Sequence, residues 1–143
     1  ECRAAMIKQI RSEMSEFRDK LKSGEMTAKL DKVLVVIKKL QEGVDGGESG
    51  LQQLKDAGVD TSAIEALLQP IIDDTQKLKE MFADLLVKMD KFFSIEDPND
   101  AYKYIETELS FEKTGEIVKV ADRLVSNIKK LQAELEKVAG KLP

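Results

Sequence analysis

The sequence predicts an all-α protein: an antiparallel up-and-down bundle of four main helices plus one or two short ones, in a single domain of residues 1–143. Charged residues make up 35% of the chain and hydrophobic residues 42%, with only 3 prolines and 8 glycines, which is typical of amphipathic helices. Apolar residues recur at alternating steps of three and four residues, the spacing that lines one face of a helix. The two-residue alternation of a β-strand is found nowhere, and 143 residues suit one core.

Two apolar stripes in different phases occupy the first part of the chain. The first consists of Ile7, Ile10, Met14, Phe17 and Leu21, and the second of Met26, Leu30, Val33, Ile37, Leu40 and Val44. The change of phase falls on Ser23-Gly24, where a glycine allows the chain to turn. We therefore expect two helices joined by a tight turn at this point.

A glycine-rich segment separates these helices from the rest. Residues 43–50 read GVDGGESG, which predicts a flexible loop. Ser49 and Gln52 have the spacing of a capping box, in which the serine hydroxyl accepts a hydrogen bond from the first helical turn. A short helix is therefore expected over 51–57, and Gly58 ends it.

The central stripe extends from Ile64 to Phe92, and Pro70 interrupts it. Proline has no amide hydrogen and its ring clashes with the preceding turn. We therefore expect a short helix that ends near Gln69 and a long helix over 70–93. Asp60-Thr61-Ser62 offers N-caps at the start, and Ser62 and Glu65 form a second candidate capping box.

The last part of the chain begins with Asp97 as an N-cap and Pro98 in the first helical position. A change of phase between Leu109 and the stripe that follows predicts a kink or break near Thr114-Gly115. That stripe consists of Ile117, Val120, Leu124, Ile128, Leu131, Leu135 and Val138, and Gly140 and Pro143 follow it. The alternative architecture is an elongated three-helix bundle in which 2–42 and 98–139 are each continuous.

The composition removes most catalytic machinery. The chain has no histidine and 1 cysteine, so the commonest general base, zinc clusters and internal disulfides are excluded. Residues 43–50 lack the spacing and lysine of a phosphate-binding loop. The acidic pairs Asp73-Asp74, Glu106 with Glu108, and Asp97 with Asp100 do not follow the order of a calcium loop. We therefore predict a protein that is not an enzyme, with no metal site and no cofactor.

Charge and hydropathy restrict the partners. The net charge is −4 and the basic residues are interspersed with acidic ones, so a nucleic-acid surface is not expected. No apolar run approaches the length of about 18 residues that a membrane span needs. The chain begins Glu1-Cys2, which indicates a processed secreted protein or a piece of a longer one, and Cys2 is either an incidental thiol or a site of pairing with another chain.

Several apolar faces are wider than a simple packing seam requires. Residues 33–37 are apolar on all sides, and Leu85-Leu86-Val87 and Phe92-Phe93 widen the central stripe. The chain also contains 5 methionines, whose flexible side chains suit irregular or adaptable pockets. One interpretation is an ordinary buried core. The other is a bundle interior that holds an acyl chain.

In its order of helices, the chain resembles the fungal hydrophobic-surface-binding proteins and the related cell-wall galactomannoproteins. The resemblance covers nearly the whole chain at the level of pattern, including Leu109, Thr114 and the closing amphipathic helix. Its most specific stretch is Leu67-Leu68-Gln69-Pro70, followed by Leu78, Phe82, Leu85, Leu86, Lys88 and Phe92. The chain departs from that family in being more charged and less rich in serine, threonine and alanine.

A more local resemblance is to the group 5 and group 21 mite allergens, which are charged helical bundles. It consists of Ser23-Gly24-Glu25, Asp97-Pro98-Asn99 and Lys113-Thr114-Gly115-Glu116. Those proteins lack room for the segment 43–69. Both resemblances imply a secreted or cell-surface helical bundle, with cell-wall proteins, allergens or antigens as its relatives.

The first resemblance implies binding of fatty acids or apolar surfaces through the bundle interior. The positions that match the inward faces of that family, carried over here as expected ligand-binding residues, are Phe17, Val33, Ile37, Phe82, Leu86, Met89, Phe93, Leu124 and Ile128. No residue stands out as an anchor for a polar headgroup. The alternative function is a protein–protein interaction module, such as a surface antigen, adhesin or scaffold fragment, with a fully packed core.

Overall fold

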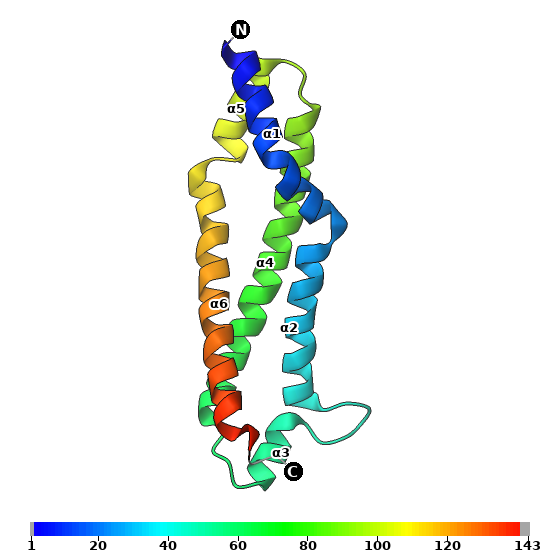
Figure 1. Ribbon diagram of the computed structural model, residues 1–143, viewed down its shortest axis with the longest axis vertical. Helices are drawn as coiled ribbons and strands as arrows, with labels where there is room; N and C mark the ends of the chain where they lie inside the picture. Colours follow the sequence, from blue (N-terminus) through cyan, green and yellow to red (C-terminus); the bar gives the residue numbers. More distant parts are fainter. Residues whose placement is uncertain (1, 141–143) are drawn as a thin grey trace. The chain divides into compact units, whose positions relative to one another are not determined.

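A computed structural model describes residues 2–140, and these residues contain helices and their connections but no strand (Figure 1). The all-α class is confirmed, as is the expectation of four long helices and two short ones. The long helices are α1 (Cys2–Ser23), α2 (Glu25–Glu42), α4 (Ser62–Ser94) and α6 (Phe111–Ala139). The short helices are α3 (Gly50–Asp56) and α5 (Pro98–Glu108).

The chain divides into two compact units. Unit 1 contains residues 2–29 and Leu78–Lys119, and therefore α1, the second part of α4, α5 and the start of α6. Unit 2 contains Leu30–Lys77 and residues 120–140, and therefore most of α2, α3, the first part of α4 and the rest of α6. The expectation of one domain over the whole chain stays a prediction.

In unit 1, arginines along α1 stack on aromatic rings. Only Ile7 and Leu21 of α1 are buried, so this helix has a small apolar contact face. The three stacks are Arg3 over Tyr102 at 3.7 Å, Arg11 over Phe92 at 5.1 Å and Arg18 over Phe93 at 4.3 Å, each measured from the guanidinium carbon to the ring centre. A stacked guanidinium contributes about 0.5–2 kcal/mol, so these contacts supplement the apolar packing of α1.

Arg11 also caps the end of α4. Its guanidinium donates hydrogen bonds to the backbone carbonyl of Phe92, at 3.0 Å, and to that of Ile95. The last carbonyls of a helix have no partner within the helix and carry a partial negative charge. The carbonyl of Phe92 also accepts from the amide of Ile95 at 3.3 Å, so the positive side chain adds a second donor there and gives a donor to the carbonyl of Ile95, just beyond the helix.

In unit 2, α3 is closed at both ends by the predicted residues. The hydroxyl of Ser49 accepts a hydrogen bond from the amide of Gln52 at 3.1 Å. Gly58 has a φ of +83°, and the amide of Val59 beyond it donates to the carbonyl of Leu54 at 2.9 Å. This is the hydrogen bond that ends a helix at a left-handed glycine. The helix occupies Gly50–Asp56, close to the expected range of 51–57.

The predicted helix break at Pro70 is wrong. Helix α4 continues through this residue from Ser62 to Ser94. A proline at this position leaves the carbonyl of Ala66, four residues earlier, without its helical donor. Both Pro70 and Ala66 are exposed, so water can reach that carbonyl. The missing hydrogen bond is therefore tolerated on the solvent side of the helix.

The start of α4 is capped by two of its three candidate N-caps. Glu65 accepts its hydrogen bond from the hydroxyl of Thr61, at 2.8 Å, rather than pairing with Ser62. The carboxylate of Asp60 accepts from the amide of Ser62 at 3.0 Å and from its hydroxyl at 2.6 Å. Asp60 and Thr61 therefore make the capping contacts, and the partner of Glu65 is Thr61 rather than the Ser62 of the expected capping box.

The break expected near Thr114-Gly115 lies earlier, at Leu109 and Ser110. The hydroxyl of Ser110 accepts from the amide of Lys113 at 3.4 Å, and its carbonyl accepts from the amide of Thr114 at 3.0 Å. Ser110 thus starts a new helix, and Gly115 lies inside it. Continuous helices over 2–42 and 98–139, as in the three-helix alternative, are therefore not found.

The predicted turn at Ser23-Gly24 is present. Gly24 separates α1 from α2 and has a φ of +76°, and its amide donates to the carbonyl of Leu21 at 3.3 Å. This backbone conformation is favourable for glycine and strained for other residues.

Thr75 of α4 carries a buried hydroxyl without a hydrogen-bond partner. The residue is 0% exposed. An unpaired buried polar group costs about 1–3 kcal/mol, whereas valine has nearly the same shape and no such group. We expect Thr75→Val to raise the free energy of unfolding by about 1 kcal/mol, measured by urea denaturation. Thr107→Val is the control, because the hydroxyl of Thr107 is exposed and donates to the carbonyl of Lys103 at 3.0 Å. A loss of stability in Thr75→Val would show that the hydroxyl has a partner.

Candidate functional site

An apolar groove lies in unit 1 between α1, α4 and the start of α6. We call it the unit 1 groove, and its volume is about 270 Å³. Its lining consists of Met14, Phe17, Leu85, Met89, Leu109, Thr114, Ile117 and Val118. Apolar grooves with few polar groups are typical of sites that bind small molecules.

Helical spacing places these side chains on one side of each helix. Met14 and Phe17 are three residues apart on α1, and Leu85 and Met89 are four apart on α4, so each pair shares a helix face. The buried floor consists of Leu85, Met89 and Leu109, which are 8%, 4% and 8% exposed. Val118, 58% exposed, lies at the edge. The groove is therefore open to solvent along α6.

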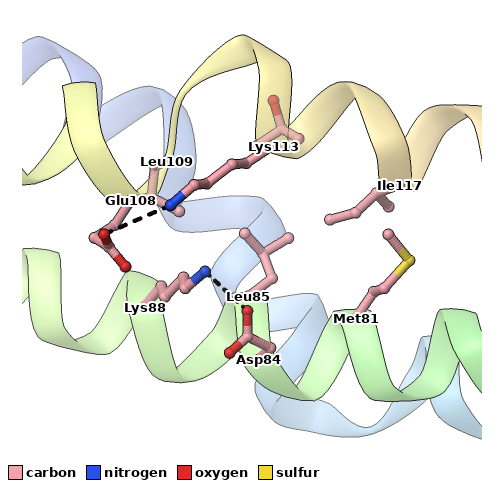
Figure 2. Close-up of a pocket in the computed structure, with 9 residues that line it drawn as sticks. Met81, Asp84, Leu85, Lys88, Glu108, Leu109, Lys113 and Ile117 are labelled. Atoms are coloured by element: carbon pink, nitrogen blue, oxygen red, sulfur yellow. Dashed lines mark ion pairs between the residues drawn. The ribbon is translucent and has the colours of Figure 1, made fainter.

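A smaller pocket with charged groups opens between α4 and α6 in the same unit (Figure 2). We call it the charged pocket, and its volume is about 70 Å³. Its lining consists of Met81, Asp84, Leu85, Lys88, Glu108, Leu109, Lys113, Thr114 and Ile117. Four of these residues, Leu85, Leu109, Thr114 and Ile117, also line the unit 1 groove. The two spaces therefore share one wall, which these four residues form.

Two lysines and two carboxylates form ion pairs at this pocket. The ammonium of Lys88 lies 3.0 Å from Asp84, one turn earlier on α4, and that of Lys113 lies 3.6 Å from Glu108 across the α5–α6 connection. Figure 2 shows both ammonium groups between the two helices, at the end of the pocket opposite Met81 and Ile117. The two ammonium groups therefore lie at one end of the pocket and Met81 and Ile117 at the other.

The protonation states at the pocket follow from its charges and burial. The hydrogen bond to Asp84 is the main reason that the pKa of Lys88 is raised above its usual value. Burial, together with the nearby carboxylate of Glu108, raises the pKa of Tyr104. Both shifts move the groups further from neutral pH. Lys88 is therefore a cation and Tyr104 a neutral phenol at pH 7.

Unit 2 has an apolar groove of its own, between α2 and α6. Its volume is about 220 Å³. Its lining consists of Lys32, Val33, Val36, Ile37, Ile128, Leu131, Gln132 and Leu135. Val36 is 48% exposed, so residues 33–37 are not buried on all sides as their composition suggested.

The ligand-binding residues expected from the sequence are distributed over both units. Phe17 and Met89 line the unit 1 groove, and Val33, Ile37 and Ile128 line the unit 2 groove. The other four have different surroundings: Phe82 and Leu124 are buried at 7% and 2% exposure, Leu86 is half-buried, and the half-buried Phe93 lies beneath Arg18. The site that sequence reasoning treated as one interior is therefore divided.

The sequence did not single out several residues that line the unit 1 groove and the charged pocket. Leu85, Leu109 and Ile117 were recognised only as members of apolar stripes. Val118 does not belong to the apolar stripe of its helix. An apolar residue outside the stripe of an amphipathic helix is the one sequence feature that could have indicated its place in the groove. Nothing in the order of the residues indicated that Lys88 and Lys113, 25 positions apart in the sequence, share a pocket.

Two of the acidic residues noted in the sequence, Asp74 and Asp97, have structural partners. Asp74 accepts two hydrogen bonds from Arg123, at 2.7 and 2.8 Å, and this guanidinium lowers the pKa of the carboxyl. The carboxylate of Asp97 caps α5 by accepting from the amide of Asp100 at 3.0 Å. These carboxylates therefore stabilise helices and helix packing.

No protein-family model, curated protein or solved structure matches this chain. The resemblances seen in the sequence therefore stay predictions. Of the helices in residues 2–140, none is both long enough and apolar enough to cross a membrane.

Proposed function

We propose that this protein binds apolar ligands with an acyl chain, such as fatty acids, in the unit 1 groove and carries or presents them without chemical change. The observation that supports the proposal is the groove itself, which has a volume of about 270 Å³ and a single polar residue, Thr114, in its lining. Met14 and Met89 contribute flexible thioether side chains that adapt to ligands of different shape.

The size of the groove limits the affinity. Each buried methylene contributes about 0.8 kcal/mol, so an eight-carbon chain gains about 6 kcal/mol when it is fully enclosed. This corresponds to a dissociation constant of about 40 µM. The loss of ligand mobility and incomplete enclosure reduce the affinity further. We therefore expect a dissociation constant between about 40 µM and 1 mM for an eight-carbon chain.

A second candidate function is a protein-interaction module. Phe111, the first residue of α6, is 96% exposed, and a fully exposed aromatic side chain is a frequent anchor in protein interfaces. The two functions differ in the residues they require. Ligand binding depends on the groove, whereas docking of a protein depends on the surface around Phe111.

Binding of 1-octanol, followed by amide chemical shifts in a nuclear magnetic resonance titration, tests the groove with an uncharged probe. Phe17→Gln and Val118→Gln should each weaken binding about 5–10-fold, because each removes about 1–1.4 kcal/mol of apolar contact. Neither residue is fully buried, so both variants should keep the helical fold.

Val125→Gln is the matched control, because Val125 is also a half-exposed valine of α6 but belongs to unit 2 and lies outside the unit 1 groove. The affinity of this variant for 1-octanol should equal that of the parent protein. Shift changes confined to residues outside the unit 1 groove, or equal losses in Val118→Gln and Val125→Gln, would contradict the proposal.

A further inference from the structure

We propose that the charged pocket is the headgroup site of the unit 1 groove and that Lys113 and Lys88 hold a ligand carboxylate there. The ligand class is then the fatty carboxylates rather than neutral apolar molecules. This inference rests on the function proposed for the groove. It adds the polar end that the sequence alone did not reveal.

The shared wall joins the two spaces along α6. Lys113 and Ile117 are four residues apart on α6, as are Thr114 and Val118, so each pair shares a row of the helix surface. Thr114 and Ile117 line both spaces, whereas Lys113 lines only the charged pocket and Val118 only the groove. The two pairs are offset by one residue, so they form adjacent rows on the helix surface. A chain that lies against Val118 and Ile117 can therefore place its end beside Lys113.

The two volumes suit the two ends of such a ligand. The charged pocket, at about 70 Å³, corresponds to about two water molecules, at about 30 Å³ each, and therefore to a group of the size of a carboxylate. The groove, at about 270 Å³, is several times larger and apolar. An amphiphile with a small charged head and an extended chain matches this combination.

Two lysines line the pocket, each paired with a carboxylate, Asp84 or Glu108. Lys88 is 24% exposed and Lys113 is 51% exposed, so the first lysine is partly desolvated and the second is open to solvent. Helix α6 begins at Phe111, and its positive end lies within one turn of Lys113. The ion pair of Lys113 with Glu108 is long, at 3.6 Å. Glu108 therefore acts as a weakly held internal anion that a ligand carboxylate replaces.

The test compares octanoate with 1-octanol, which has the same chain and no charge. Binding is measured at low salt by isothermal titration calorimetry or by chemical shifts in a nuclear magnetic resonance titration. Lys113→Gln and Lys88→Gln should each weaken octanoate binding about 3–5-fold and should change 1-octanol binding less than 2-fold. Glu108→Gln should strengthen octanoate binding about 2–3-fold, because it removes the competing carboxylate. These changes should shrink at high salt.

Lys119→Gln is the matched control, since it removes an exposed lysine of α6 that does not line the pocket. Lys113→Arg, which keeps the charge, should retain octanoate binding. Weaker octanoate binding in Glu108→Gln, or equal effects of Lys113→Gln and Lys119→Gln, would overturn the headgroup assignment while 1-octanol still binds. Absence of binding for both probes would overturn the groove itself, and with it this inference.

Discussion

Replacement of Phe92 by alanine is expected to lower the free energy of unfolding by about 3–5 kcal/mol, the usual range for a large aromatic side chain in a packed core. Phe92 is 0% exposed and its ring packs edge-on against Phe93, with 5.8 Å between the ring centres. The guanidinium of Arg11 lies over the same ring. The substitution therefore creates a cavity and also removes the surface on which part of α1 rests.

Thermal and urea denaturation measure this effect, and Phe111→Ala provides a control of the same chemistry. Phe111 is 96% exposed, so its replacement should change stability by no more than about 0.5 kcal/mol. A similar small change for Phe92→Ala would mean that unit 1 repacks around the missing ring. Signals from unit 1 and unit 2 should be followed separately, because a change confined to unit 1 would show that unfolding is not two-state.

Replacement of Arg123 by leucine should cost about 2 kcal/mol at pH 7. It leaves the carboxylate of Asp74, whose side chain is 9% exposed, without its guanidinium partner. Breaking a fully buried ion pair in this way costs about 3–5 kcal/mol. Arg123 is 54% exposed, so water can reach part of the site and the expected loss is smaller.

The effect of Arg123→Leu should depend on pH. Arg123 lowers the pKa of Asp74 in the folded protein below its ordinary value of 3.8. The contribution of this ion pair to stability is therefore complete above pH 3.8 and is lost as the pH falls through the lower pKa of the folded state. The difference in stability between parent and variant should therefore shrink below about pH 4, which urea denaturation at several pH values measures. Lys20→Gln breaks the exposed pair with Glu16, at 3.8 Å, and should change stability by less than about 0.5 kcal/mol. A difference that is independent of pH would assign the effect of Arg123 to packing rather than charge.

The sequence predicts a helix end well where a single side chain caps the helix. Ser49 and Asp97 cap their helices because a hydroxyl or carboxylate accepts the amide three residues later, which is visible in the sequence. The predicted helix break at Pro70 does not occur, because water can reach the carbonyl that proline leaves without a donor. The sequence does not indicate this solvent access. The break at Ser110 was placed near Gly115 because the change of phase spans both residues, and the sequence does not say which one caps a helix.

The candidate site could be predicted only in part. The resemblance to the fungal family implied Phe17 and Met89 as ligand-binding residues, and both line the same groove. Which apolar stripes pack against each other depends on how the helices cross. The spacing of residues within a stripe does not indicate the crossing angle. Lys88 and Lys113 come together for the same reason, since they belong to different helices and are ordinary surface residues in the sequence.

The division into units has a consequence for dissecting the protein. Each unit is assembled from two separate stretches of chain, and the boundary at Leu78 falls inside α4 while that at Val120 falls inside α6. Any uninterrupted fragment that contains all of one unit therefore also contains a large part of the other. Truncation from the amino terminus removes α1 and part of α2 before it reaches most of unit 2, and any deletion that ends within α4 or α6 shortens a helix that the other unit also uses. Point substitutions, rather than excised fragments, are the means to assign a property to one unit.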